Sequence, residues 1–320
     1  MTANGLLALL LLAGVPICGA PVASQSTSRA TTAPGPSEGA TPVGVEVEVA
    51  RDLTYLATRP VAAGGTTLDL YYTASAPGAA PADPSPIVVF VHGGGWRRGD
   101  KAQHAEKGEY FARAGFLFAS INYRLYPDVD PATQALDVAQ AVSWIARNAE
   151  TYDADPTLVF LMGHSAGAHL AALAALDPTY LERARFPRQH LRGVVLLDGA
   201  GYDLLERQGS ELARELDLLR TVFGDDPATL RRLSPIHAID IDAGGAPPAF
   251  LVLHVPREAS RQASEKLSAR LRQAGGTAEV VETPGKSHRT LNRELGHDGD
   301  GPTTLVSTFL RRLSNSASQP

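Results

Sequence analysis

Cysteine is almost missing from the sequence: Cys18 is the only one, and it lies near the N-terminus. A disulfide within the chain is therefore excluded, and cysteine pairing says nothing about the compartment. Motifs for metals and cofactors are missing too. There is no HExxH, no cluster of Cys and His, no carboxylate set with metal-ligand spacing, no Walker A loop and no dinucleotide fingerprint. We therefore expect neither a metal nor a cofactor.

The sequence also has no run of basic residues, and its formal net charge is −5 at pH 7. Nucleic-acid-binding proteins usually carry a basic patch or stripe that neutralises phosphates. The charge therefore argues against a nucleic-acid partner.

Residues 6–15 form an apolar run that is too short to span a bilayer comfortably but has the length of a signal-peptide core. We predict a signal peptide over residues 1–24, although no Lys or Arg precedes the run. Its removal would leave an exported protein, periplasmic or secreted, without stable membrane insertion. Lipid anchoring at Cys18 is the alternative, but Ile17 is bulky where a lipoprotein signal has a small residue.

Residues 25–44 are rich in Pro, Ser, Thr, Ala and Gly, which predicts a disordered linker. The remaining chain has an ordinary globular composition, since the whole sequence is 44% hydrophobic and 20% charged. We therefore expect a single folded domain over residues 45–315.

Strand and helix patterns follow one another through this domain. Residues 45–49, 53–56 and 67–72 alternate apolar and polar side chains, which predicts antiparallel strands at one edge of a sheet. Apolar strands then alternate with amphipathic helices, which predicts parallel βαβ units. The expected strands are 87–91, 116–121, 158–162, 193–197, 249–253 and 278–282, and the expected helices are 103–114, 131–149, 168–176, 209–223, 259–274 and 302–313. The fold class is α/β, with a mostly parallel central sheet, antiparallel N-terminal edge strands and helices on both faces.

Ser165 lies in the sequence Gly163-His164-Ser165-Ala166-Gly167, which matches G-x-S-x-G between a predicted strand and a predicted helix. This context is typical of the nucleophile elbow, a sharp turn whose flanking positions are too crowded for side chains. The following helix directs its amide dipole at negative charge that forms near the serine. The alternative interpretation of the motif is an ordinary Gly/Ser turn.

A second glycine-rich segment, His92-Gly93-Gly94-Gly95-Trp96, directly follows another buried strand. Consecutive glycines allow backbone amides, rather than side chains, to face a ligand. Such amides stabilise an oxyanion in acyl transfer. By itself the segment is equally compatible with a flexible loop.

Together, the two motifs and the segment Asn122-Tyr123-Arg124-Leu125 resemble the α/β-hydrolase superfamily, in particular the esterase/lipase branch with an HGGG motif. Within that branch the chain is similar to hormone-sensitive-lipase-like carboxylesterases, bacterial carbohydrate acetyl and feruloyl esterases, and kynurenine formamidases. The resemblance extends from about residue 45 to residue 313. It implies an α/β-hydrolase fold, Ser165 as nucleophile, and an oxyanion hole from the amides of Gly94, Gly95 and Ala166.

A serine nucleophile needs a base. His288 lies in a loop, residues 284–289, between the last predicted strand and the last predicted helix. The order nucleophile, acid, base along the chain places the base in this loop. We predict His288, with His297 as the alternative; His92 and His164 belong to the motifs and are interpreted as positioning residues.

The acid of the triad has two candidates. The families commonly show L-H-G-x-x-D after the penultimate strand, where this chain has Leu253-His254-Val255-Pro256-Arg257-Glu258. Glu258 is therefore the first candidate, although a carboxylate at the start of a helix also has a purely structural explanation. Asp198, at the end of the preceding strand, is the alternative.

These residues predict a serine hydrolase that cleaves carboxylic esters through an acyl-enzyme, with a small-molecule ester as its substrate. An arylformamidase acting on a formyl amide would use the same groups. A non-catalytic binding protein of the same fold is the alternative of a different class. The segment 199–248 is long enough to form a cap over the site, and the sequence gives no oligomeric state.

Overall fold

The structure is a computed structural model that describes residues 46–57, 65–73, 83–206, 213–240 and 246–317. The predicted signal peptide and the predicted linker lie outside these residues, as do parts of the 199–248 segment. No helix within the described ranges is both long and apolar enough to cross a bilayer.

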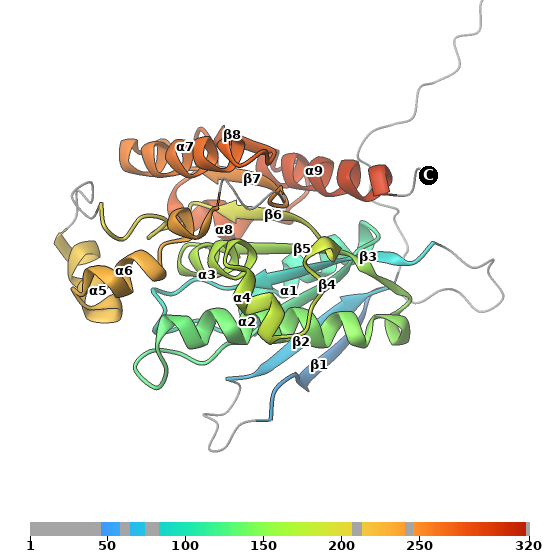
Figure 1. Cartoon of the computed structure of the whole chain (residues 1–320). Helices are drawn as coiled ribbons and strands as arrows, with labels where there is room; N and C mark the ends of the chain where they lie inside the picture. The colour runs from blue at the N-terminus through green and yellow to red at the C-terminus, as the bar shows by residue number, and fades with distance from the viewer. Residues whose placement is uncertain (1–45, 58–64, 74–82, 207–212, 241–245, 318–320) are drawn as a thin grey trace, which may run out of the picture. The chain divides into compact units, whose positions relative to one another are not determined.

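The described residues contain eight strands, of which β1 to β3 come first and β4 to β8 then alternate with helices (Figure 1). The strands are β1 (Glu48–Thr54), β2 (Thr67–Tyr72), β3 (Ser85–Val91), β4 (Leu117–Ile121), β5 (Ala154–His164), β6 (Leu191–Leu197), β7 (Ala249–His254) and β8 (Ala278–Glu282). The α-helices are α1 (Ala105–Arg113), α2 (Pro131–Arg147), α3 (Ala166–Leu176), α4 (Pro178–Arg183), α5 (Ala213–Phe223), α6 (Pro227–Arg232), α7 (Glu258–Gln273), α8 (His288–Glu294) and α9 (Gly301–Ala317). Short 3-10 turns are η1 (Lys101–His104), η2 (Ala149–Tyr152), η3 (Arg188–His190) and η5 (Pro235–Ala238).

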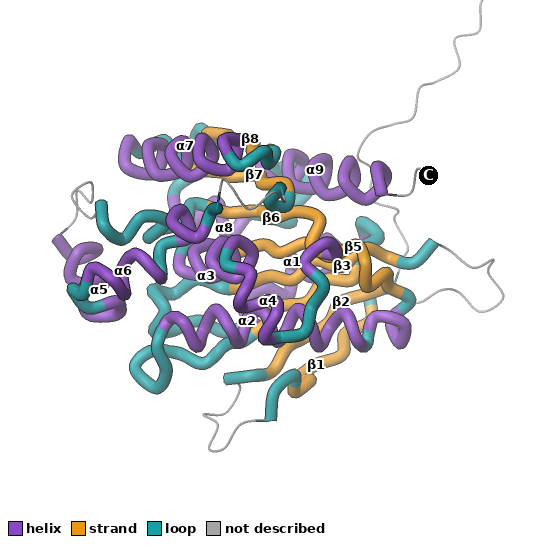
Figure 2. The backbone as a smooth tube through the Cα atoms, viewed as in Figure 1, coloured by secondary structure: helices purple, strands orange, loops and turns teal. Residues whose placement is uncertain are grey.

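All eight strands form one sheet in the order β1-β2-β4-β3-β5-β6-β7-β8. β2 pairs antiparallel with both β1 and β4, while every pair from β4 to β8 is parallel. The sheet is thus mostly parallel with antiparallel strands at its N-terminal edge, as predicted. Its strands run through the middle of the fold between helices (Figure 2).

Apolar strands are buried on both sides because helices cover both faces of the sheet. In β3, Val89 and Val91 pack into a cluster that includes side chains of α2, α3 and α7. Val88 and Phe90 point the other way, into a cluster that includes side chains of α1, α8 and α9. The carboxyl ends of the parallel strands meet at one edge, where the loops described below converge.

Several boundaries differ from the prediction. Residues 45–49 and 53–56 were expected as separate strands, but one strand, β1, has a register shift between Ala50 and Leu53. Asp52, at φ 55°, accommodates this irregularity. The 284–289 loop is shorter than expected, because α8 begins at His288. α8 has only seven residues, which is too short for a helix to be recognised from the periodicity of its apolar residues.

Candidate active site

Ser165 stands alone between β5 and α3, with φ 55° and ψ −121°. This left-handed backbone is rare for a residue with a side chain and marks a strained turn. The flanking glycines make the turn possible: a Cβ at Gly163 would lie 2.3 Å from the Gly167 carbonyl oxygen, and one at Gly167 would lie 2.2 Å from the Val91 carbonyl oxygen. The predicted strand–turn–helix elbow is therefore present.

The Ser165 hydroxyl faces the imidazole of His288. His288 Nε2 lies 3.0 Å from Ser165 Oγ, within hydrogen-bond distance. His288 is the first residue of α8, and Ser287 caps that helix by accepting a hydrogen bond from the Thr290 amide. The helix start thus fixes the backbone that carries the ring.

The other ring nitrogen, His288 Nδ1, lies 2.5 Å from Asp198 Oδ2. Asp198 follows the last residue of β6, and its side chain is fully buried. Burial favours a raised pKa for Asp198, but the hydrogen bond and charge interaction with His288, followed by the Ser260 side chain and the Val255 amide, outweigh burial, so the pKa is lowered. Asp198 is therefore a buried, ionised carboxylate against the imidazole.

Glu258, the first candidate for the acid, is not at this position, and the expectation for it is corrected. It is the first residue of α7, and its side chain is 53% exposed. Its carboxylate accepts hydrogen bonds from Arg261 and Gln262 on the same helix. Glu258 therefore has the helix-start role, favoured by the helix dipole.

His297, the alternative base, also lies away from the serine. Its ring contacts Glu106 at 3.1 Å on the surface. The structure therefore brings together Ser165, His288 and Asp198 from the predicted residues.

The HGGGW loop lies directly beside the elbow. A Cβ at Gly93 would be 2.8 Å from His164 Nδ1 and 3.1 Å from Ser165 Cβ. Gly94 and Gly95 have φ values of 127° and 61°, which turn their amides in a way that L-residues rarely allow. Neither amide donates to an acceptor among the described residues. Ala166, the third predicted donor, is the first residue of α3.

Two motif histidines support this arrangement. His164 Nε2 lies 2.9 Å from the His288 carbonyl oxygen, and the two rings are 4.5 Å apart. Burial, followed by the nearby His288, lowers the pKa of His164 to about 3. His164 is therefore neutral, and a neutral ring with the proton on Nε2 donates to that carbonyl.

His92 is the second. Its ring stacks on Tyr123 at 4.5 Å, and the Tyr123 hydroxyl donates to the His92 carbonyl at 2.9 Å. Burial lowers the pKa of His92. This pair fixes the start of the glycine loop.

An apolar wall covers the glycine loop. Trp96 packs edge-on against Phe223 of α5 at 4.8 Å, and its Nε1 donates to His169 Nδ1 at 3.3 Å. Leu218 of α5 lies against the loop itself, since a Cβ at Gly95 would be 2.9 Å from Leu218 Cδ2. The sequence predicts a cap only as the segment 199–248, because nothing in the pattern of α5 distinguishes Leu218 from its neighbours.

The arrangement has the parts for nucleophilic catalysis: a hydroxyl, an imidazole within reach of it, and a carboxylate on the far side of the ring. Two amides that donate to no acceptor in the described part of the chain lie on the neighbouring loop. In the described part of the chain, no group of three or more His, Cys, Asp or Glu side chains is placed to hold a metal.

Comparisons with known proteins agree with this geometry. Esterase LipC of Mycobacterium tuberculosis is 32% identical over 257 residues, which is 75% of this chain and 61% of LipC. Isoprenylcysteine alpha-carbonyl methylesterase of Arabidopsis thaliana is 29% identical over 241 residues, or 70% of this chain and 54% of that protein. The chain thus spans little more than half the length of these relatives.

Solved structures are similar over more of their length. Esterase B of Lactobacillus rhamnosis covers 88% of this chain and 92% of its own, with a TM-score of 0.69 and 22% identity. Thermogutta terrifontis esterase 2, in a propionate-bound structure, covers 86% of this chain and 95% of its own, with a TM-score of 0.61 and 26% identity. These likenesses confirm the α/β-hydrolase fold. The BD-FAE family model matches residues 68–267, which carry Ser165 and Asp198, and the chain belongs to the BD-FAE family.

Proposed function

We propose that this protein is a serine hydrolase that cleaves small-molecule carboxylic esters through an acyl-enzyme. The observation that carries the proposal is the continuous line from Ser165 Oγ through the His288 ring to Asp198, with contacts of 3.0 and 2.5 Å. A hydroxyl is a weak nucleophile, and this arrangement is what activates it. The similarity to an esterase and to a methylesterase supports the same reaction class.

In the first half of the reaction, Ser165 Oγ attacks the carbonyl carbon of the ester while His288 Nε2 takes its proton. The carbonyl π electrons move to the oxygen. When the oxyanion collapses, the bond to the alcohol oxygen breaks, and His288 gives its proton to the leaving alcohol. Water then repeats the sequence on the acyl-enzyme, releasing a carboxylic acid and restoring Ser165.

Asp198 and the backbone amides have separate roles in this proposal. Asp198 accepts from Nδ1–H, which sets the tautomer and stabilises the imidazolium while His288 holds the proton. The amides of Gly94, Gly95 and Ala166 donate to the oxyanion. Loss of one such donor typically costs about 3 kcal/mol of barrier.

The test is hydrolysis of p-nitrophenyl acetate, butyrate and a long-chain ester, with N-formylkynurenine in parallel. We expect ester turnover and labelling of Ser165 by a fluorophosphonate, both lost in Ser165→Ala. Faster turnover of N-formylkynurenine than of every ester would favour an arylformamidase instead. A folded protein with neither turnover nor labelling would contradict both activities and leave a binding protein of this fold.

Export remains part of the proposal, supported by the apolar run at residues 6–15. Fractionation of cells that express the whole chain tests it. We expect a shortened protein in the periplasm or medium; a full-length protein inside the cell would contradict export.

A further inference from the structure

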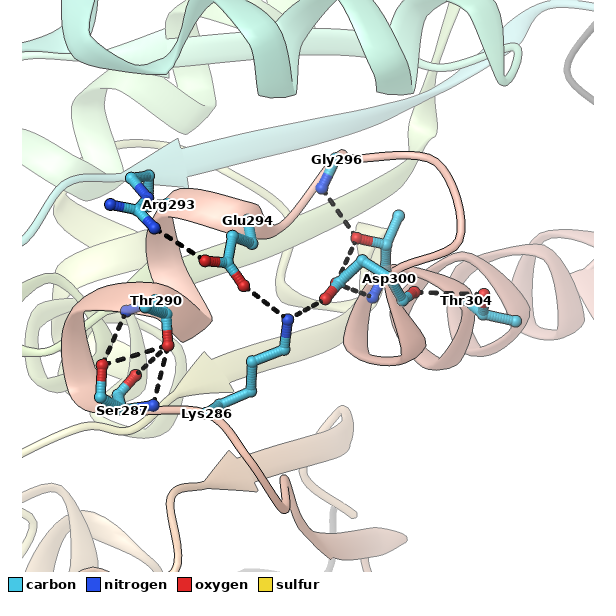
Figure 3. A network of polar contacts seen from close by, with 9 residues as sticks. Lys286, Ser287, Thr290, Arg293, Glu294, Gly296, Asp300 and Thr304 are labelled. Carbon is cyan, nitrogen blue, oxygen red and sulfur yellow. Dashed lines mark hydrogen bonds and ion pairs between the residues drawn. The ribbon is translucent and has the colours of Figure 1, made fainter.

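Lys286 lies two residues before His288, and its side chain extends to a position between Glu294 and Asp300 (Figure 3). Its ammonium donates to Glu294 Oε2 at 2.8 Å, at the far end of the same helix, and also to Asp300 Oδ1. The Lys286 side chain is only 17% exposed, and that of Asp300 only 4%. The Lys286 ammonium therefore connects the residue before α8 to the end of α8 and to the segment that follows it.

Asp300 connects this cation to the next helix. Its other oxygen, Oδ2, accepts from the amide and the hydroxyl of Thr303 in the first turn of α9. The Thr303 hydroxyl in turn accepts from the Gly296 amide in the loop between the helices. Since Phe309 and Leu310 of α9 are in the core, the network ties the α8 region to a buried helix.

α8 needs such a connection because it has only seven residues. A helix this short has little stability of its own. The His288 side chain is 44% exposed, so packing alone does not fix it, whereas its partners Ser165 and Asp198 are held by the sheet. The distance from Nε2 to Ser165 thus depends on where the start of α8 is held.

We propose that Lys286 is a positioning residue that holds the start of α8, and with it His288, in register with Ser165 and Asp198. This inference rests on the proposed hydrolase function. Lys286 touches neither substrate nor reacting atoms; it acts through the backbone of α8. The hydrogen bonds with Asp300 and then Glu294 raise the pKa of Lys286, and the Lys286 contact lowers that of Glu294. The cation and the carboxylate therefore stay charged across neutral pH.

The test compares Lys286→Met with Lys286→Arg. We expect kcat for p-nitrophenyl acetate to fall about 10- to 100-fold in Lys286→Met with KM within about twofold, because displaced reacting groups lose rate more than binding. Fluorophosphonate labelling of Ser165 falls in parallel. Lys286→Arg keeps a cation between the two carboxylates and recovers most of kcat.

Two further variants separate positioning from stability. Lys266 is a matched control, since its ammonium also bridges two carboxylates, Asp203 and Glu206. Lys266→Met should lower Tm without lowering kcat. Glu294 keeps its contact with Arg293 when Lys286 is replaced, so the carboxylate to remove is the buried Asp300. In Lys286→Met/Asp300→Asn the buried charge that Lys286 neutralised is gone, so Tm should recover while kcat stays low.

Recovery of kcat in the double variant, or an equal loss of kcat in Lys266→Met, would assign the effect to stability and overturn the proposal. Unchanged kcat in folded Lys286→Met would overturn it as well. A wild-type protein without any ester turnover would instead remove the proposed function, so the two failures are distinguishable.

Discussion

At the scale of single residues, Asp198 is placed by the sheet rather than by its own loop. Its amide donates to the Leu253 carbonyl at 2.7 Å, and its Oδ1 accepts from the Val255 amide at 3.3 Å. Both partners belong to β7 or directly follow it. Asp198 therefore spans the carboxyl ends of two neighbouring strands, and its remaining oxygen meets His288.

Replacement of Asp198 by Asn should lower kcat for p-nitrophenyl acetate by roughly 10⁴-fold, because an amide does not select the tautomer that leaves Nε2 unprotonated. Stopped-flow or steady-state assays of purified protein measure this. Glu258→Gln is the matched control and should remain within about twofold, since exposed substitutions usually change little. Loss of activity in Glu258→Gln alone would reverse the assignment.

The comparison of Asp198 with Glu258 also shows which members of the triad can be predicted from the sequence. Ser165 is recognisable because the glycines that it needs are its sequence neighbours, and His288 follows from chain order. The acid cannot be recognised in this way, because its position depends on contacts between segments that are far apart in the sequence. β6 and β7 are parallel neighbours with Leu197 opposite Leu253, so a carboxylate after either strand starts near the base. Which one reaches it depends on the loop after β7, which enters α7 at once and turns Glu258 outward.

At the scale of elements, the mostly parallel sheet and the positions of its central strands were predictable, because strands buried on both faces are continuous apolar runs. The short helices α4, α6 and α8 were not expected, because each has six or seven residues. Periodicity needs two or more turns to be visible. The positioning role of Lys286 could not be predicted either, because it depends on α8, the helix that the sequence does not reveal.

α5 is the element that closes over the glycine loop, and Leu218 is its contact with Gly95. Leu218→Ala should raise kcat/KM for p-nitrophenyl octanoate relative to acetate by about tenfold, because removal of the branched side chain leaves room for added methylenes. Separate variation of the acyl chain and the alcohol shows which side of the ester Leu218 limits.

Leu219 is the matched control on the same helix, because it is buried in the core instead. Leu219→Ala should lower Tm without changing the ratio of the two substrates. A ratio unchanged in Leu218→Ala would mean that this residue does not line the substrate site.

At the scale of the whole molecule, burial lowers the pKa of several histidines besides His92, and the shift is large for three of them. Burial is the largest cause for each, and it lowers the pKa of His104 to about 2, of His164 to about 3 and of His169 to about 4. Each ordinarily titrates near 6.5. Below that pH the unfolded chain binds protons that the folded chain does not.

The free energy of unfolding should therefore fall as pH drops from about 6.5 toward 4, with a slope of up to about 1.4 kcal/mol per pH unit for each histidine. Urea unfolding at several pH values measures the slope. His104→Phe keeps an aromatic ring against Phe90 but removes one titrating group. The variant should therefore reduce the slope by the contribution of one histidine. A slope that is the same in this variant would contradict the neutral burial of His104.

His164 gives the fold a further property. It is bound to Ser165 through the peptide bond and to His288 through a hydrogen bond, although Ser165 and His288 are 123 positions apart. His164 thus contributes, beside Lys286, to the spacing of Ser165 and His288, and it does so without contacts to α5, whose Leu218 and Phe223 lie against the glycine loop. Substitutions in α5 can therefore change which esters fit the site, while the distance between Ser165 and His288 is kept.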